Sequence, residues 1–230
     1  MKLRIRFQKT DSMKFIGHLD TMRFFQKLMR LAEIDVRYSE GFSPHPIMSF
    51  ALPLWVGVES TGEYLDLEVH STDASEASLQ RINTCMPEGL LALSYKQLPD
   101  NAKNAMALVA AADYLIFPKQ GEMQNLAEKI QTVFTDAPAF LIRKKTKKSE
   151  RELDLKQYVY AFSSTEEGLF CRLSAGSETN IKPELLLDAF FERAGLTFTK
   201  TDWQIRRLDL YGKNEAGELQ SLDAYGETIW

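Results

Sequence analysis

The chain has 230 residues, of which 44% are hydrophobic and 26% are charged, a composition typical of a soluble globular protein with a real core. This composition excludes a disordered, collagen-like or coiled-coil chain, and no apolar run approaches the roughly 18 to 20 residues that a membrane-spanning helix needs. The net charge of −4 does not by itself suggest a polyanion-binding protein, but the positive charges are unevenly distributed.

Two segments are basic although the chain as a whole is acidic. Residues 1–50 contain nine lysines and arginines against five acids, and residues 140–160 contain seven against three, so each segment has a local balance of +4. Such a distribution is typical of a protein that offers a polyanion a localised basic surface. It is equally compatible with two solvated faces of ordinary elements.

The amino terminus and the cysteines indicate a cytoplasmic protein. Residues 1–6 alternate charged and apolar side chains and lack the continuous apolar stretch of a signal peptide. Cys85 and Cys171 stand alone in apolar surroundings, which argues against a disulfide scaffold and against a zinc or iron–sulfur site built from cysteine. We therefore expect no cofactor, no metal and no membrane partner.

The first hundred residues predict the order β-α-β-β-α-β. Leu3, Ile5 and Phe7 alternate with arginines, which is the period of a strand with one buried face. A helix follows from His18 to about Ile34. The other predicted elements are strands over 48–57 and 64–69, a helix over 74–85 and a strand over 90–97.

The predicted helix from His18 is amphipathic and carries a basic stripe. Gly17 can serve as its N-cap, and Asp20 lies in the first turn, where an acid favours the helix dipole. One face, predicted to be buried, consists of Met22, Phe25, Met29 and Ala32. Another face carries the cations Arg23, Lys27 and Arg30, which recur at i, i+4 and i+7.

The predicted order of elements restarts in the second half, so we predict an α+β protein of two tandem ferredoxin-like (βαββαβ) units with antiparallel sheets. The predicted domains are residues 1–98 and 107–212, followed by a loosely held acidic tail over 213–230. The second domain is expected to contain strands over 114–117, 140–144, 153–163, 168–173 and 203–210, and helices over 121–134 and 182–194.

Two histidines are candidates for acid–base chemistry or metal binding. His18 lies where the first strand turns into the basic helix, and His45 lies in the following loop, so both could approach Asp20. The alternative is that His18 is a helix-capping or half-buried histidine and that His45 is an exposed loop residue. No close-spaced histidine pair of the kind found in zinc hydrolases supports the metal hypothesis.

The loop over 41–46 and the second basic segment are candidates for nucleic-acid binding. Pro44 and Pro46 stiffen the loop, which can present Phe42 and His45 as stacking faces to unpaired bases. A corner that only directs the next strand is the alternative. The densest cationic run, suited to phosphate contacts or to an acidic protein surface, consists of Arg143, Lys144, Lys145, Lys147 and Lys148.

Several motifs resemble those of the radical-SAM-linked proteins, a bacterial family treated as a domain of unknown function. The motifs are Phe-Ile-Gly-His-Leu-Asp over 15–20, Tyr-Ser-Glu-Gly-Phe-Ser-Pro-His-Pro over 38–46 and Ser-Phe-Ala-Leu-Pro-Leu over 49–54. Arg-Glu-Leu-Asp-Leu over 151–155 is similar to a later block of the family. Gly17 stands where the family has serine, while His18 and Asp20 match.

This resemblance implies a partnership with a radical S-adenosylmethionine (SAM) enzyme, encoded beside such proteins or fused to them and in some cases cobalamin-binding. The iron–sulfur cluster would then belong to the partner. Our leading hypothesis is a non-catalytic accessory protein that binds RNA or a ribonucleoprotein substrate through a basic face. The alternatives are an RNA-processing or metal-assisted enzyme that uses His18 and His45, and a module that only docks onto the radical SAM partner.

Overall fold

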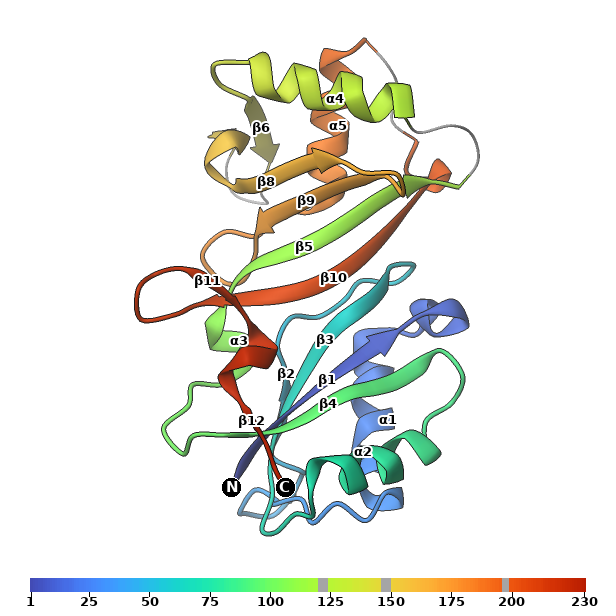
Figure 1. The fold of residues 1–230 in the computed structure, drawn as a ribbon, viewed down its shortest axis with the longest axis vertical. Helices are drawn as coiled ribbons and strands as arrows, with labels where there is room; N and C mark the ends of the chain where they lie inside the picture. The colour runs from blue at the N-terminus through green and yellow to red at the C-terminus, as the bar shows by residue number, and fades with distance from the viewer. Residues whose placement is uncertain (120–123, 146–149, 196–198) are drawn as a thin grey trace. The chain divides into compact units, whose positions relative to one another are not determined.

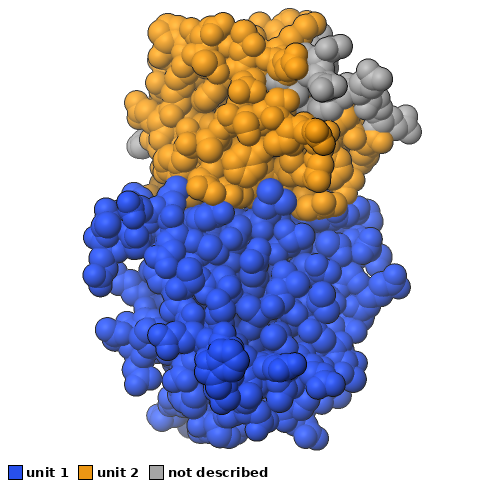
Figure 2. Space-filling model, viewed as in Figure 1, with its two compact units in different colours: residues 1–110, 207–230 blue, residues 111–206 orange. Residues whose placement is uncertain are grey.

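The computed structural model describes residues 1–119, 124–145, 150–195 and 199–230, with the backbone alone at 124–127, 143–145 and 150–151. The chain forms two compact units, coloured separately in Figure 2. Unit 1 comprises residues 1–110 and 207–230, and unit 2 comprises residues 111–206.

Unit 1 is built on antiparallel strands, with β1 between β3 and β4, β2 paired to β3, and β12 paired to β4. β10 is the next neighbour of β3, and β11 pairs with β10. Its elements in chain order are β1 (Lys2–Lys9), the 3-10 helix η1 (Asp11–Phe15), α1 (His18–Leu31), β2 (Met48–Phe50), β3 (Glu59–Glu68), α2 (Ser75–Thr84), β4 (Leu90–Leu98), α3 (Ala105–Leu108), the later part of β10 (Trp203–Lys213), β11 (Leu219–Ser221), the 3-10 helix η4 (Leu222–Tyr225) and β12 (Glu227–Thr228).

One face of the unit 1 sheet is covered by α1 and α2, as Figure 1 shows. The alternating Leu3, Ile5 and Phe7 are buried on this face, which confirms the predicted period of β1. The predicted core face of α1 is also confirmed, because Phe25 and Met29 are fully buried against the same cluster. Burial of these side chains removes apolar surface from water and fixes the helix on the sheet.

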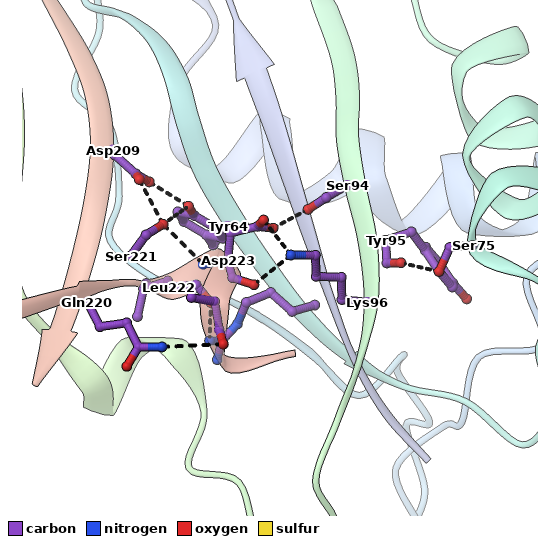
Figure 3. Close-up of polar contacts among 12 residues, drawn as sticks. Tyr64, Ser75, Ser94, Tyr95, Lys96, Asp209, Gln220, Ser221, Leu222 and Asp223 are labelled. Atoms are coloured by element: carbon purple, nitrogen blue, oxygen red, sulfur yellow. Dashed lines mark hydrogen bonds and ion pairs between the residues drawn. The ribbon is translucent and has the colours of Figure 1, made fainter. Parts of the chain in front are cut away.

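The opposite face of the unit 1 sheet is covered by the C-terminal residues. Arg4 donates to the carbonyl oxygen of Leu222 at 2.9 Å, and Lys96 donates to the Asp223 carboxylate at 2.6 Å (Figure 3). On the same face, Tyr64 donates to Asp209 at 2.5 Å. The first two contacts hold η4 against β1 and β4, and the third joins β3 to β10.

The C-terminal tail is therefore part of unit 1, whereas the sequence suggested a loosely held segment. Its acids and glycines resemble those of a linker, but Leu222 is fully buried and Gly226 packs against Lys96, where a side chain would not fit. The predicted domains, 1–98 and 107–212 with a tail over 213–230, also differ from the observed units, because residues 207–230 belong with residues 1–110. Long-range strand pairing, which leaves no local signal in the sequence, decides this assignment.

Unit 2 also combines antiparallel strands with helices. β9 lies between β5 and β8, and β6 and β7 pair only with each other in a separate two-stranded sheet. The elements are β5 (Val109–Pro118), α4 (Gln124–Asp136), β6 (Leu141–Lys145), β7 (Glu150–Asp154), the 3-10 helix η2 (Leu155–Gln157), β8 (Val159–Ser164), β9 (Leu169–Ser174), α5 (Pro183–Arg193), the 3-10 helix η3 (Lys200–Asp202) and the first residues of β10. The core contains a cluster of aromatic rings with centroids 5.1–5.6 Å apart, formed by Phe134, Phe140, Phe162 and Phe190.

Two predicted strands are shortened or divided in the structure. The strand predicted over 48–57 is only β2, Met48–Phe50, because Pro53 cannot donate a ladder hydrogen bond and the chain runs irregularly from 51 to 58. The strand predicted over 153–163 is divided by η2 into β7 and β8.

The chain is a mixed α+β protein with a mostly antiparallel sheet and few helices, in agreement with the predicted class. None of the helices in the described ranges is long and apolar enough to cross a membrane.

Candidate nucleic-acid interface

The basic stripe of α1 is exposed as predicted. Arg23, Lys27 and Arg30 all lie on the solvent side of the helix, opposite the residues that pack on the sheet. Arg23 donates to Asp20 at 3.2 Å, and both side chains are about two-thirds exposed, so this pair is weak. Among the residues that the structure describes, Lys27 and Arg30 have no carboxylate partner.

After α1 the chain forms a short hairpin over residues 36–47, called here the proline hairpin. Tyr38 and Pro46 face each other across it in an isolated bridge, and the Ile47 amide donates to the Arg37 carbonyl at 2.8 Å. The hairpin is attached to the end of β3, because the Arg37 amide donates to the Glu68 carbonyl at 2.8 Å. Its base is therefore fixed on the sheet.

The tip of the proline hairpin is closed by Ser39 and His45. The Ser39 amide donates to the His45 carbonyl at 2.9 Å, and the Ser39 hydroxyl accepts from the His45 amide at 3.1 Å. The same hydroxyl lies 2.9 Å from His45 Nδ1. At the tip Gly41 has a φ of +111°, which favours glycine, and Phe42 next to it has its whole side chain in solvent. The hairpin thus presents an aromatic ring on a loop that is closed by hydrogen bonds.

The connection between α1 and the proline hairpin is short and hydrogen-bonded. The Ile34 amide donates to the Met29 carbonyl at 2.9 Å, which ties the chain back onto the last turn of α1. Glu33 and Asp35 are exposed in this connection. The exposed basic stripe of α1 therefore ends where the helix ends.

The candidate histidines occupy different environments. The His18 ring is half-buried at the start of α1 and packs edge-on against Phe50, with centroids 5.4 Å apart. His45 is exposed and held by Ser39. In the described part of the chain, His18 and His45 share no hydrogen bond, ring contact or cavity. Asp20, the acid that both were expected to approach, pairs with Arg23. In the same part of the chain no cluster of three or more histidines, cysteines or acids is arranged to hold a metal.

A buried ionic cluster beside His18 was missed by the sequence analysis. Lys9, Glu63 and Arg207 are all at least 95% buried, and Arg207 donates to both carboxylate oxygens of Glu63, at 2.8 and 2.5 Å. Lys9 donates to the Ile16 carbonyl at 2.5 Å. Burial lowers the pKa of Lys9, the Glu63 carboxylate opposes this shift, and the Arg207 guanidinium adds to it. The signal for Lys9 was available, because it continues the inward-facing period of β1.

The small cavity between His18, Lys9 and Glu63 is about 10 Å³, the space of at most one water molecule. Thr21, Phe7, Phe50 and two leucines complete its walls. A substrate therefore has no room here, and we interpret the cluster as structural.

The second cationic run falls on the β6–β7 hairpin of unit 2. In its backbone register Arg143 faces Glu152, Lys144 faces Arg151 and Lys145 faces Glu150. The side chains at 143–145 are not described, and Lys147 and Lys148 lie outside the described residues. A role of this run in binding stays a prediction.

Residues 2–183 match the model of a protein family described as "Uncharacterized protein conserved in bacteria (DUF2344)", and the chain belongs to this family. A search of curated proteins found no significant match. Among solved structures, "Crystal Structure of a Cbf5-Nop10-Gar1 Complex" has a chain with a TM-score of 0.48 and 13% identity, and the match covers 90% of this chain and 48% of that one. "X-ray crystal structure of a heavy metal efflux pump, crystal form II" has a TM-score of 0.25 and 5% identity, covering 90% and 28% respectively.

Proposed function

We propose that this protein is a non-catalytic, cytoplasmic accessory protein that binds single-stranded RNA, free or in a ribonucleoprotein, and presents it to a radical SAM enzyme. The observation that carries the proposal is the exposed stripe of α1, in which Lys27 and Arg30 have no carboxylate partner among the described residues. Such cations attract phosphates, because each neutralised phosphate releases condensed counterions.

The proline hairpin supplies the second half of the interface. Unpaired bases stack on exposed aromatic rings, and a ring on a preformed loop loses little conformational entropy when it binds. Phe42 meets both conditions, because it is fully exposed and the loop is closed by Ser39 and His45. Stacking of this kind tolerates any base, so we expect a preference for unpaired RNA and little sequence specificity.

The radical SAM partner is proposed from the sequence motifs over 15–20 and 38–46. The chemistry, including the iron–sulfur cluster and in some cases cobalamin, would reside in that partner. We also propose that both units are ferredoxin-like. The strand order β4-β1-β3-β2 in unit 1 and the order β5-β9-β8 in unit 2 support this interpretation.

The test is a fluorescence-anisotropy titration of the full chain with labelled unstructured and hairpin RNAs. Lys27→Glu with Arg30→Glu should weaken binding of the unstructured RNA by at least about tenfold, because two phosphate contacts become repulsive. The matched control is Lys129→Glu with Lys213→Glu, which makes the same charge change at two other exposed lysines. Equal loss in both double variants, or no RNA binding by the wild type, would refute the proposal.

A second candidate function, docking onto the radical SAM partner alone, is favoured by an apolar surface near the start of α1. Phe15, Leu19 and Val56 are each more than half exposed. The Gly57 amide donates to the Lys14 carbonyl at 2.8 Å, which places Val56 close to Phe15. Co-purification with the partner enzyme that survives nuclease but is lost in Phe15→Ser with Leu19→Ser would support this function.

A further inference from the structure

An open groove of about 460 Å³ lies in unit 1 between the segment 98–104 and the ends of β2 and β3. Its outer wall is fixed by two hydrogen bonds to the sheet. Lys2 on β1 donates to the Ala102 carbonyl at 2.9 Å, and the Ala105 amide donates to the Asp66 carboxylate at 2.6 Å. The groove is therefore preformed, and its volume is in the range of small-ligand sites.

The charges around the groove are not balanced. Asp66 and Glu68 both line it, but Arg4 donates to both oxygens of Asp66, at 2.7 and 2.9 Å, and Arg37 donates to Glu68 at 2.9 Å. The carboxylates are thus already neutralised. Lys2 and Lys103 line the same groove.

Neither of these lysines has a carboxylate partner in the described ranges, and Lys103 is exposed. The groove with its paired arginines therefore has an excess of two positive charges. An anionic ligand group would be attracted to it.

The remaining lining suits a ligand with a flat apolar part. Ile47, Met48 and Leu98 provide apolar walls, and Ser49 adds a hydroxyl. Asn104, which lines the groove, uses its side-chain oxygen to accept from the Ala107 amide at 2.9 Å, so its NH₂ group remains available as a donor. An apolar wall, amide and hydroxyl groups and an ammonium together match the base, sugar and phosphate of a nucleotide.

The groove is continuous with the proline hairpin. Ile47 lines the groove and also closes the base of the hairpin through its bond to Arg37, while its carbonyl accepts from the Glu68 amide at 3.0 Å. An RNA strand with one base stacked on Phe42 would therefore extend along the hairpin toward the groove. We propose that this groove binds one nucleotide of the RNA strand, with the phosphate at Lys103 and the base against Met48; this inference rests on the proposed function.

The experiment compares AMP, adenosine and inorganic phosphate as probes of the full chain by isothermal titration calorimetry, together with RNA anisotropy. The variants are Lys103→Glu, the matched control Lys213→Glu at another exposed lysine of unit 1, and Ala102→Phe, which fills the groove. We expect AMP to bind more tightly than either adenosine or phosphate. Lys103→Glu and Ala102→Phe should each weaken AMP binding by at least about tenfold, and Lys213→Glu should leave it unchanged.

The outcomes separate the groove from the wider interface. Lys27→Glu with Arg30→Glu should weaken RNA binding but leave AMP binding intact. The groove proposal is wrong, while the proposed function stands, if the chain binds RNA but shows two negative results. These are that AMP does not bind and that neither Lys103→Glu nor Ala102→Phe changes the affinity for RNA. Equal binding of phosphate and AMP would overturn the proposal, as would AMP binding by a chain that binds no RNA.

Discussion

Unit 1 contains two sets of cations that look alike in the sequence and behave differently in the structure. Arg4 and Arg207 point into the fold, are at most 1% exposed and each holds one carboxylate with two hydrogen bonds. Lys27 and Arg30 on α1 point into solvent. In the buried set, Arg4 fixes β1 to β3 and to the Leu222 carbonyl, and Arg207 fixes β10 to β3. Of the two sets, only the exposed one is available to a partner.

The comparison shows why a count of charges overstates the basic surface. The balance of +4 over residues 1–50 includes Arg4 and Lys9, which are both buried. A buried cation is neutralised by a neighbour or shifts its pKa, so it adds little to the field outside. Position on the inward or outward face of an element therefore decides the role of each cation.

The largest effect expected from this comparison is the loss of Arg207. Arg207→Met would leave the Glu63 carboxylate buried without its bidentate partner, and removing one member of a buried pair costs about 3–5 kcal/mol. Equilibrium unfolding in urea measures this change.

The control removes all three charges of the buried cluster. Arg207→Met combined with Glu63→Leu and Lys9→Met should recover most of the lost free energy of unfolding, because no uncompensated charge of the cluster remains. If Arg207→Met alone lowered the free energy of unfolding no more than Arg30→Met on the exposed face, the two sets of cations would not differ in the way described.

The second prediction concerns the C-terminal cover. Leu222→Ala should lower the free energy of unfolding by about 2–5 kcal/mol, because the side chain is fully buried against the sheet. Trp230→Ala, at an exposed ring eight residues later, should change it by less than about 0.5 kcal/mol. Two equally small effects would indicate the loose tail that the sequence suggested.

Local patterns in the sequence predicted most of unit 1. The period of β1, the apolar face of α1 and the Gly17 cap are encoded within a few residues, and the observed helix begins at His18 as expected. The exposure of the loop around Phe42 also follows from local proline and glycine chemistry.

Features that depend on distant segments could not be predicted in this way. Glu63 has its buried ion-pair partner in Arg207, which lies 144 residues later in the chain. The cover formed by η4 and the groove beside Lys103 likewise arise from contacts between segments that lie far apart in the chain. These residues are visible in the sequence, but the residues near them in the chain do not predict the contacts.

The third prediction tests the exposed ring. Phe42→Ala should weaken binding of unpaired RNA by about 1–3 kcal/mol in an anisotropy titration, because one stacked base loses its platform. The free energy of unfolding should not change, since the ring is fully exposed. Phe42→Trp should preserve the affinity, and a loss in this variant equal to that in Phe42→Ala would argue against stacking.

The smallest effect is a pH dependence caused by Lys9. Burial lowers its pKa from the usual 10.5, so at high pH the unfolded chain holds a proton that the folded chain has released. Stability attributable to Lys9 should therefore rise with pH as the pH passes the folded-state pKa and approaches 10.5. Urea unfolding of the wild type and of Lys9→Met across this range gives the difference, and a difference that is flat or falls with pH would contradict the assignment.

The most direct test of the account is the salt dependence of RNA binding. For single strands the slope of log affinity against log salt is about −0.7 per phosphate contact, so Arg23→Gln, Lys27→Gln and Arg30→Gln together should flatten the wild-type slope by about 2. The account predicts this change with no change in the free energy of unfolding. Equal slopes for the wild type and the triple variant, or binding that is indifferent to salt, would contradict it.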